Sequence, residues 1–158
     1  MFKHPGSAYV VTFATTAMST VAQNVFPFQA GANTRVVLEE INLGIASTLA
    51  ASVGVSIYRG STTPLSTAAY GTLVNLDGWS GASTAGSRVN PPSSALPSTA
   101  SAVLIDARNF EDGFHYTFKG RGDVILAPSQ RVDVVIQALP VTSVFATFKI
   151  REIGKNPV

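Results

Sequence analysis

Apolar and polar residues alternate with a period of two along much of this chain. The alternation is clearest at 9–14, 53–58, 114–119, 132–137 and 144–151. Successive side chains of a β-strand point to opposite faces, so each of these segments predicts a strand with one buried face. No segment shows a convincing amphipathic-helix pattern.

Further segments predict strands from shorter patterns. Residues 102–105 and 124–126 are brief apolar runs, and residues 72–76 form another within a polar stretch. Residues 25–28 are apolar but include Pro27, which has no N–H to donate to a sheet. We therefore place this last segment at a sheet edge or a bend.

The longest candidate strand is 35–46, and its pattern is irregular. Glu39 and Glu40 interrupt the alternation, and Gly44 follows soon after. A helix of this length is possible on propensity alone. Enrichment in Val and Ile, together with these interruptions, favours a bent or bulged strand.

Turn-forming residues separate the predicted strands. We expect turns at 29–33, 120–123 and 127–130, and a polar connection at 106–113. About eight strands, spaced about 8 to 12 residues apart, are typical of a sandwich or barrel. We therefore predict an all-β fold, a jelly-roll-like antiparallel β-sandwich of about eight strands, as a single domain over 1–158.

One long segment, 61–100, differs from the rest in composition. It is rich in Ser, Thr, Ala, Gly and Pro, and its only charged residues are Asp77 and Arg88. A loop of this length within a compact domain is usually functional or partly disordered. We expect a Ser/Thr/Gly/Pro-rich loop here, an N-terminal arm at 1–7 and a C-terminal tail at 154–158.

The chain is poor in charge. Charged residues make up 13% of the 158 residues, against about 25% in a typical soluble domain. Such a surface suits burial against further copies or a large partner. The net charge of +2 comes with no basic cluster, so we expect no nucleic-acid partner.

No apolar run is long enough for a membrane span, and the absence of cysteine excludes disulfides and thiolate zinc sites.

Two motifs could carry chemistry, and each has a structural explanation. Arg121–Asp123 spells a cell-adhesion tripeptide, but Gly120 and Gly122 favour a hairpin turn there. His4 and His115 are the only histidines. We interpret His115 as a surface or interface residue, because one strand histidine does not supply the several ligands that a metal site needs.

Carboxylates also fall short of a recognisable site. Oxygen ligands of the kind that calcium prefers occur at Asp106, Asn109, Glu111 and Asp112. Their spacing matches no EF-hand, so we predict a solvated turn. Glu39 and Glu40 are adjacent and are expected on opposite faces of a strand, although Asp133 could face one of them. With no Gly-x-Ser-x-Gly, phosphate-binding or dinucleotide-binding motif, we expect no enzyme, cofactor or metal.

Trp79 is the only tryptophan and lies in the polar 61–100 segment. An exposed aromatic side chain there could stack on a sugar or anchor a partner. Alternatively, it folds back and pins the segment to the sheets. Tyr70 and Leu73 could share either role.

The strand patterns resemble small virion structural proteins of tailed phages. The resemblance rests first on Arg35–Gly44 and Val53–Gly60, a strand that ends in Tyr-Arg-Gly before a long Ser/Thr/Ala/Pro loop. Later segments are similar in order and spacing: Phe114–Phe118, Val124–Pro128, Arg131–Ile136 and Phe145–Glu152. The resemblance covers most of 34–153. It implies a β-sandwich head-decoration or cement protein and names no catalytic residue.

We therefore expect a non-enzymatic virion protein, assembled in the host cytoplasm, that binds the major capsid protein and stabilises the head shell, as a trimer. The residues predicted to make contacts are Phe2, Tyr70, Leu73, Trp79 and Arg88. Alternatives are a tail, fibre or jelly-roll capsid subunit, and a carbohydrate-binding or adhesin module in which Tyr70 and Trp79 stack on sugar rings.

Overall fold

The described part of the chain contains β-strands and the turns and connections beside them, and no helix. A computed structural model describes residues 7–14, 22–25, 27–45, 53–60, 74–76, 88–89, 102–110, 115–119, 124–137 and 144–153. These residues form twelve strands and no helix. The strands are β1 (Ser7–Ala14), β2 (Gln23–Asn24), β3 (Phe28–Gln29), β4 (Arg35–Ile45), β5 (Val53–Arg59), β6 (Val74–Asn75), β7 (Arg88–Val89), β8 (Val103–Phe110), β9 (His115–Lys119), β10 (Ile125–Leu126), β11 (Arg131–Ile136) and β12 (Val144–Ile153). The predicted all-β class is confirmed.

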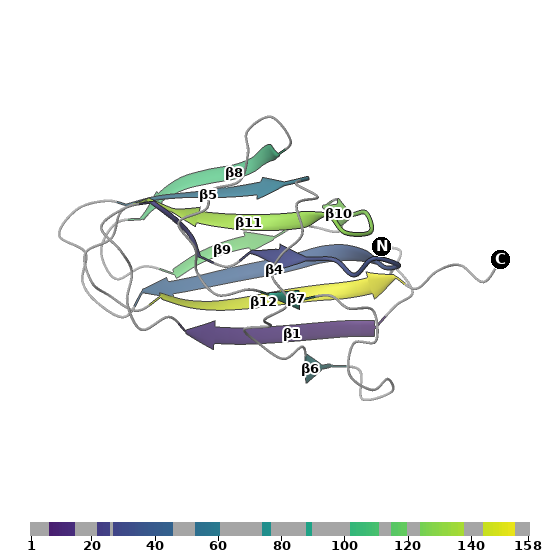
Figure 1. The fold of residues 1–158 in the computed structure, drawn as a ribbon. Helices are drawn as coiled ribbons and strands as arrows, with labels where there is room; N and C mark the ends of the chain where they lie inside the picture. The colour runs from purple at the N-terminus through teal and green to yellow at the C-terminus, as the bar shows by residue number, and fades with distance from the viewer. Residues whose placement is uncertain are drawn as a thin grey trace.

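The strands form two sheets (Figure 1). Sheet A has the order β10-β4-β12-β1-β6, and β9 also pairs with β4. Sheet B has the order β7-β3-β11-β5-β8, and β2 also pairs with β11. Every pairing is antiparallel.

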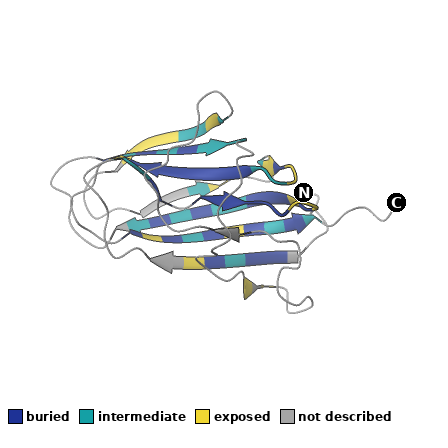
Figure 2. Cartoon of the chain, viewed as in Figure 1, coloured by how far each residue is buried: buried dark blue, intermediate teal, exposed yellow. Residues whose placement is uncertain are grey.

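The two sheets share one hydrophobic core. Alternate residues of β12 (sheet A) and of β11 (sheet B) belong to the same buried cluster, which is visible as dark blue in Figure 2. Phe28 of sheet B stacks on Phe148 of sheet A, with ring centroids 6.3 Å apart and ring planes 23° apart. Both side chains are fully buried. The apolar faces of β5, β11 and β12 are therefore buried between the two sheets.

Residues 35–45 form a bulged strand, as predicted, and not a helix. Lys149 pairs with Glu40, while the next residue of β12, Ile150, pairs with Leu38. Glu39 is therefore the extra residue of a β-bulge. The two glutamates that interrupt the sequence pattern mark the position of the bulge.

The prediction for Pro27 is also confirmed. Asn24 pairs with Val135 and Phe28 pairs with Val132, so three residues of one strand lie opposite two of the other. Pro27 lies within this irregular stretch between β2 and β3. A residue without an N–H is tolerated there because the regular ladder is already interrupted.

The predicted polar connection over 106–113 is wrong for its first half. Residues 106–110 continue β8 and pair with β5. The sequence pattern fails because β8 is an edge strand on which Ala107, Arg108 and Asn109 are all exposed. A strand with so little burial needs no alternation of apolar and polar residues.

The predicted hairpin at the Arg-Gly-Asp tripeptide is wrong. The strands on either side, β9 and β10, both pair with β4 in the antiparallel sense. They therefore run in the same direction along one side of β4 and do not pair with each other. The Leu38 N–H also donates to the Val124 carbonyl at 2.9 Å, which places the chain beside β4 again after residues 120–123. The tripeptide itself lies outside the described residues.

The low-charge segment contributes a strand to each sheet. β6 pairs with β1 at one edge of sheet A, and β7 pairs with β3 at one edge of sheet B. The short strand predicted within 72–76 is thus confirmed. The segment between β5 and β8 touches both sheets at their edges.

The predicted turn at 127–130 is confirmed and joins sheet A to sheet B. The Gln130 N–H donates to the Ala127 carbonyl at 3.0 Å, and Ser129 has a positive φ of 64°. Pro128 followed by a residue of positive φ is typical of a type II turn. The Gln29 side-chain amide donates to the Ser129 carbonyl at 2.9 Å and ties the turn to β3.

Candidate interaction surfaces

The structure describes little of the predicted contact set. Phe2, Tyr70, Leu73 and Trp79 lie outside the described residues. Arg88 is placed by its backbone in β7, where it pairs with Gln29 at the edge of sheet B. Whether these five residues share one surface therefore stays a prediction.

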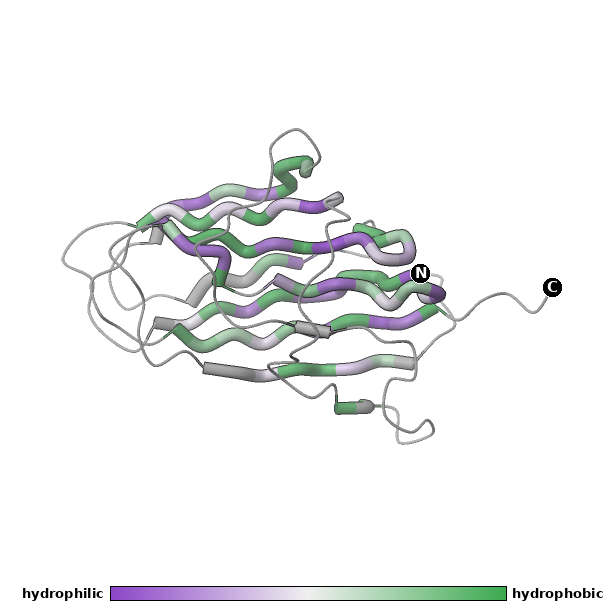
Figure 3. Tube along the Cα trace, viewed as in Figure 1, coloured by the Kyte–Doolittle hydropathy of each residue, from purple (hydrophilic) through white to green (hydrophobic). Residues whose placement is uncertain are grey.

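Exposed large apolar side chains concentrate at the sheet edges. The described examples, with exposed fractions of 39% to 59%, are Val74, Leu76, Val103, Leu104, Ile125 and Phe145. All but Phe145 lie on or directly beside the edge strands β6, β8 and β10, and Figure 3 shows apolar residues at β6 and at the start of β8. Isolated soluble proteins usually place charge at their edges, so apolar edges are typical of surfaces that meet another chain.

Glu39 and Glu40 lie on the same face of sheet A, which corrects the expectation of opposite faces. Leu38 and Ile41, on either side of them, both belong to the shared core. The bulge adds one residue between these two core positions and so resets the alternation. Both glutamates consequently lie on the outer face, turned away from the core.

Ion pairs and hydrogen bonds engage both of these carboxylates. The Arg151 Nε lies 2.9 Å from the Glu39 Oε1, and the Lys149 Nζ lies 3.7 Å from the Glu39 Oε2. The Asn42 amide donates to the Glu40 Oε1 at 2.6 Å. Paired and charge-compensated carboxylates of this kind make a polar face and not an acid–base pair for glycoside hydrolysis.

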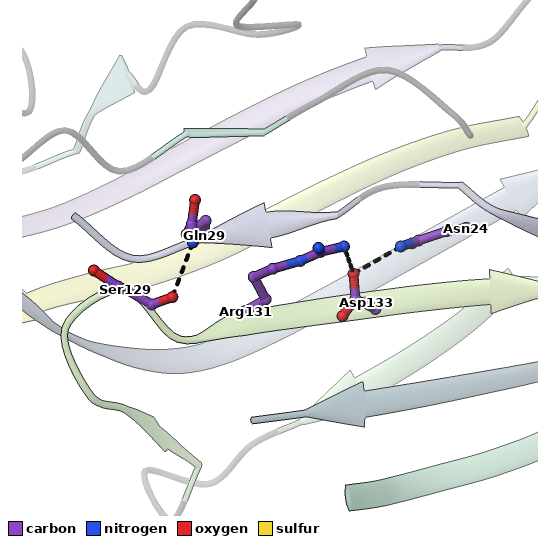
Figure 4. A network of polar contacts seen from close by, with 5 residues as sticks. All are labelled: Asn24, Gln29, Ser129, Arg131 and Asp133. Atoms are coloured by element: carbon purple, nitrogen blue, oxygen red, sulfur yellow. Dashed lines mark hydrogen bonds and ion pairs between the residues drawn. The ribbon is translucent and has the colours of Figure 1, made fainter. Parts of the chain in front are cut away.

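The face of sheet B that is turned away from the shared core contains a polar network, and the side chains of this network are buried (Figure 4). Asp133, which is fully buried, forms an ion pair with Arg131. The Asn24 amide donates to the Asp133 Oδ1 at 2.7 Å. The sequence leaves open that Asp133 faces Glu39 or Glu40, but Asp133 belongs to sheet B and both glutamates belong to sheet A. The Arg-x-Asp spacing on a strand was the signal for its true partner, because residues two apart share a face.

The oxygen-rich cluster predicted near residue 106 does not form one ligand set. Asp106 and Asn109 lie three residues apart on β8, which places them on opposite faces of the strand. Glu111, Asp112 and His4 lie outside the described residues, and His115 is described only by its backbone in β9. Among the described residues, no group of three or more His, Asp or Glu side chains could hold a metal ion.

The comparisons with known proteins add no relative. No family model, curated protein or solved structure matches the chain. Within the described ranges, no helix is long and apolar enough to cross a membrane.

Proposed function

We propose that the chain folds as an eight-stranded jelly-roll sandwich. β2 and β3 lie one after the other along β11, and β9 and β10 do the same along β4. We therefore count β2 with β3 as one interrupted strand, and β9 with β10 as another. With β6 and β7 set aside as additions from the low-charge segment, eight strands remain.

The order of pairing supports this assignment. The first of the eight strands pairs with the last (β1 with β12) and the second with the seventh (β3 with β11). The third pairs with the sixth (β4 with β9) and the fourth with the fifth (β5 with β8). These four pairings are those of one long hairpin of eight strands. When this hairpin is rolled up, β4 also pairs with β12 and β5 also pairs with β11, as they do here. Jelly rolls occur in viral capsid and lectin domains.

The function that these features support best is structural: a phage head-decoration or cement protein that binds the major capsid protein on the outside of the shell. The observation that carries this proposal is the concentration of exposed apolar side chains at the edges of a weakly charged molecule. Such edges are stabilised when a neighbour covers them. The paired carboxylates on the outer face of sheet A favour a binding role over catalysis.

In this proposal the protein bridges neighbouring capsomers and remains on the virion after assembly in the host cytoplasm. The arm at 1–7 and the segment at 61–100 reach the neighbours, and a trimer presents three such sets of contacts. Each contact need be only moderately strong, because several linked contacts raise the overall affinity without any new kind of interaction. The proposed contact residues are Phe2, Tyr70, Leu73, Trp79 and Arg88.

Co-sedimentation with empty heads assembled from the major capsid protein of the same virus tests the proposal. We expect saturable binding that weakens in Trp79→Ala and Arg88→Ala but not in Thr12→Ala, a control on the exposed outer face of sheet A. Absence of binding by the unaltered protein would refute a decoration role. Glycan binding that is lost in Trp79→Ala would instead support the carbohydrate-binding alternative.

A further inference from the structure

The β8 edge of sheet B is the longest edge strand in the described part of the chain. β8 has eight residues and, among the described strands, pairs only with β5. A free edge presents backbone N–H and C=O groups that can pair with another chain. We propose that the Asp106 side chain blocks a backbone N–H of this edge and so prevents β8 from pairing with a second copy of the protein.

The hydrogen bonds of β5 show which backbone groups face which neighbour. The Gly54 carbonyl accepts from the Gln137 N–H at 2.9 Å, and the Gly60 N–H donates to the Arg131 carbonyl at 3.1 Å. Both bonds point from β5 toward β11. In an antiparallel ladder the N–H and C=O of one residue point to the same side, and successive residues alternate. The even-numbered residues of β5 therefore face β11, and the odd-numbered residues face β8.

The same alternation fixes the direction of the Ala107 backbone. Val55 and Ile57 face β8 and pair with Arg108 and Asp106, respectively. The backbone groups of Arg108 and Asp106 must therefore point back at β5. Ala107, which lies between them, presents its N–H and C=O to the side of β8 that faces away from β5, where no described strand pairs.

Asp106 occupies the donor that this edge would offer to another strand. Its Oδ1 accepts from the Ala107 N–H at 3.0 Å. Its Oδ2 lies 3.6 Å from the Arg108 Nε, an ion pair that holds the carboxylate beside the strand. An incoming strand would have to displace this carboxylate before it could bond to Ala107.

A bulge next to Asp106 shortens the regular part of the edge. Ile57 pairs with Asp106, and the next residue, Tyr58, pairs with Leu104, so Ile105 is an extra residue. Ile105 packs against the shared core, which holds the bulge in place. A bulge, a charged pair and a capped N–H are all devices that discourage edge pairing, and here they occur within four residues.

A second copy is the partner that the exposed edge fits when the cap is removed. If two β8 strands meet antiparallel with Ala107 opposite its equivalent, each Asp106 lies opposite the other copy's Arg108. Shifting the pairing so that either Asp106 or Arg108 lies opposite its own equivalent places like charges face to face, which is unfavourable. The charges of two β8 strands are thus complementary in one antiparallel register. The hydrogen bond from the Ala107 N–H to Asp106 prevents the two strands from pairing in that register.

A fluorescent label on β8 tests this proposal. The chain has no cysteine of its own, so one introduced cysteine is labelled at a single position. Asn109→Cys, an exposed position on β8, carries pyrene, and excimer emission reports that two β8 strands have come together. We combine the label with Asp106→Ala, which removes the cap, and with Asp106→Asn, whose amide oxygen can still accept from the Ala107 N–H. Ala127→Cys, an exposed turn position, carries the control label.

We expect a concentration-dependent gain of excimer emission only for Asp106→Ala with the label at residue 109. Amide exchange at Ala107 should become about fivefold faster in Asp106→Ala and remain unchanged in Asp106→Asn. No excimer gain in Asp106→Ala, or an equal gain in Asp106→Asn, would overturn the proposal. An equal gain from the label at residue 127 would overturn it too, because it would place the new contact elsewhere. The inference does not rest on the proposed head binding, because excimer emission is measured on the protein alone and head binding is measured with heads present.

Discussion

Two Asp–Arg pairs with the same spacing but different burial allow a direct test of the buried network. Arg131 and Asp133 lie two residues apart on β11, with side chains 11% and 0% exposed. Asp106 and Arg108 lie two residues apart on β8, with side chains 22% and 68% exposed. The perturbation is Asp→Asn in each pair, which removes the negative charge and preserves the size of the side chain.

We expect Asp133→Asn to destabilise the protein by about 3 to 5 kcal/mol, because it leaves the Arg131 charge buried without its counter-ion. The same change at Asp106 should cost less than about 1 kcal/mol, because solvent screens an exposed pair. Replacing both members of the buried pair, as in Arg131→Met with Asp133→Leu, should restore part of the lost stability, because the Asn24 amide still loses its acceptor on Asp133. That double change removes both charges and leaves neither unpaired.

Urea unfolding followed by far-ultraviolet circular dichroism measures these differences. With a slope of about 1 to 3 kcal/mol per molar urea, a loss of 3 kcal/mol lowers the unfolding midpoint by about 1 to 3 M. The slopes must agree between variants for the comparison to hold. A midpoint for Asp133→Asn as close to the unaltered protein as that of Asp106→Asn would refute the argument that burial makes this network important for stability.

Three further variants test packing and turn geometry by the same unfolding assay. Phe148→Ala should lower the free energy of unfolding by about 3 to 5 kcal/mol, because the Phe148 ring packs between the sheets. Phe145→Ala, on the same strand but with a side chain 47% exposed, should lower it by about 1 kcal/mol. Equal losses would contradict a core shared by both sheets. Ser129→Gly should raise the free energy of unfolding by about 0.5 to 1 kcal/mol. Glycine removes the steric strain of a φ of 64°, and this gain exceeds the cost of the greater conformational entropy that glycine gives the unfolded chain. A loss of stability would contradict this. Gln29→Ala should cost about 1 kcal/mol by removing the hydrogen bond to the Ser129 carbonyl, and an unchanged midpoint would show that the turn does not need it.

The amino-acid sequence by itself determined the class of fold and most of the strands. Alternation is a local property, since it depends only on successive side chains pointing to opposite faces of one strand. β5, β11 and β12 were therefore predicted with nearly correct bounds. Proline determined the turn at 127–130, through Pro128, and the irregularity at Pro27 in the same local way.

Tertiary structure decided which strands became neighbours and which side chains met. The Asn24 and Asp133 side chains that share a hydrogen bond are 109 residues apart in the sequence, so no local pattern joins them. β8 escaped prediction beyond residue 105 because an edge strand needs little apolar character. Glu39 and Glu40 came to share a face because β4 must keep its apolar residues on the core across a bulge imposed by its pairing with β12. Local chemistry sets the conformation of each strand, whereas the burial of apolar faces between two sheets sets their partners.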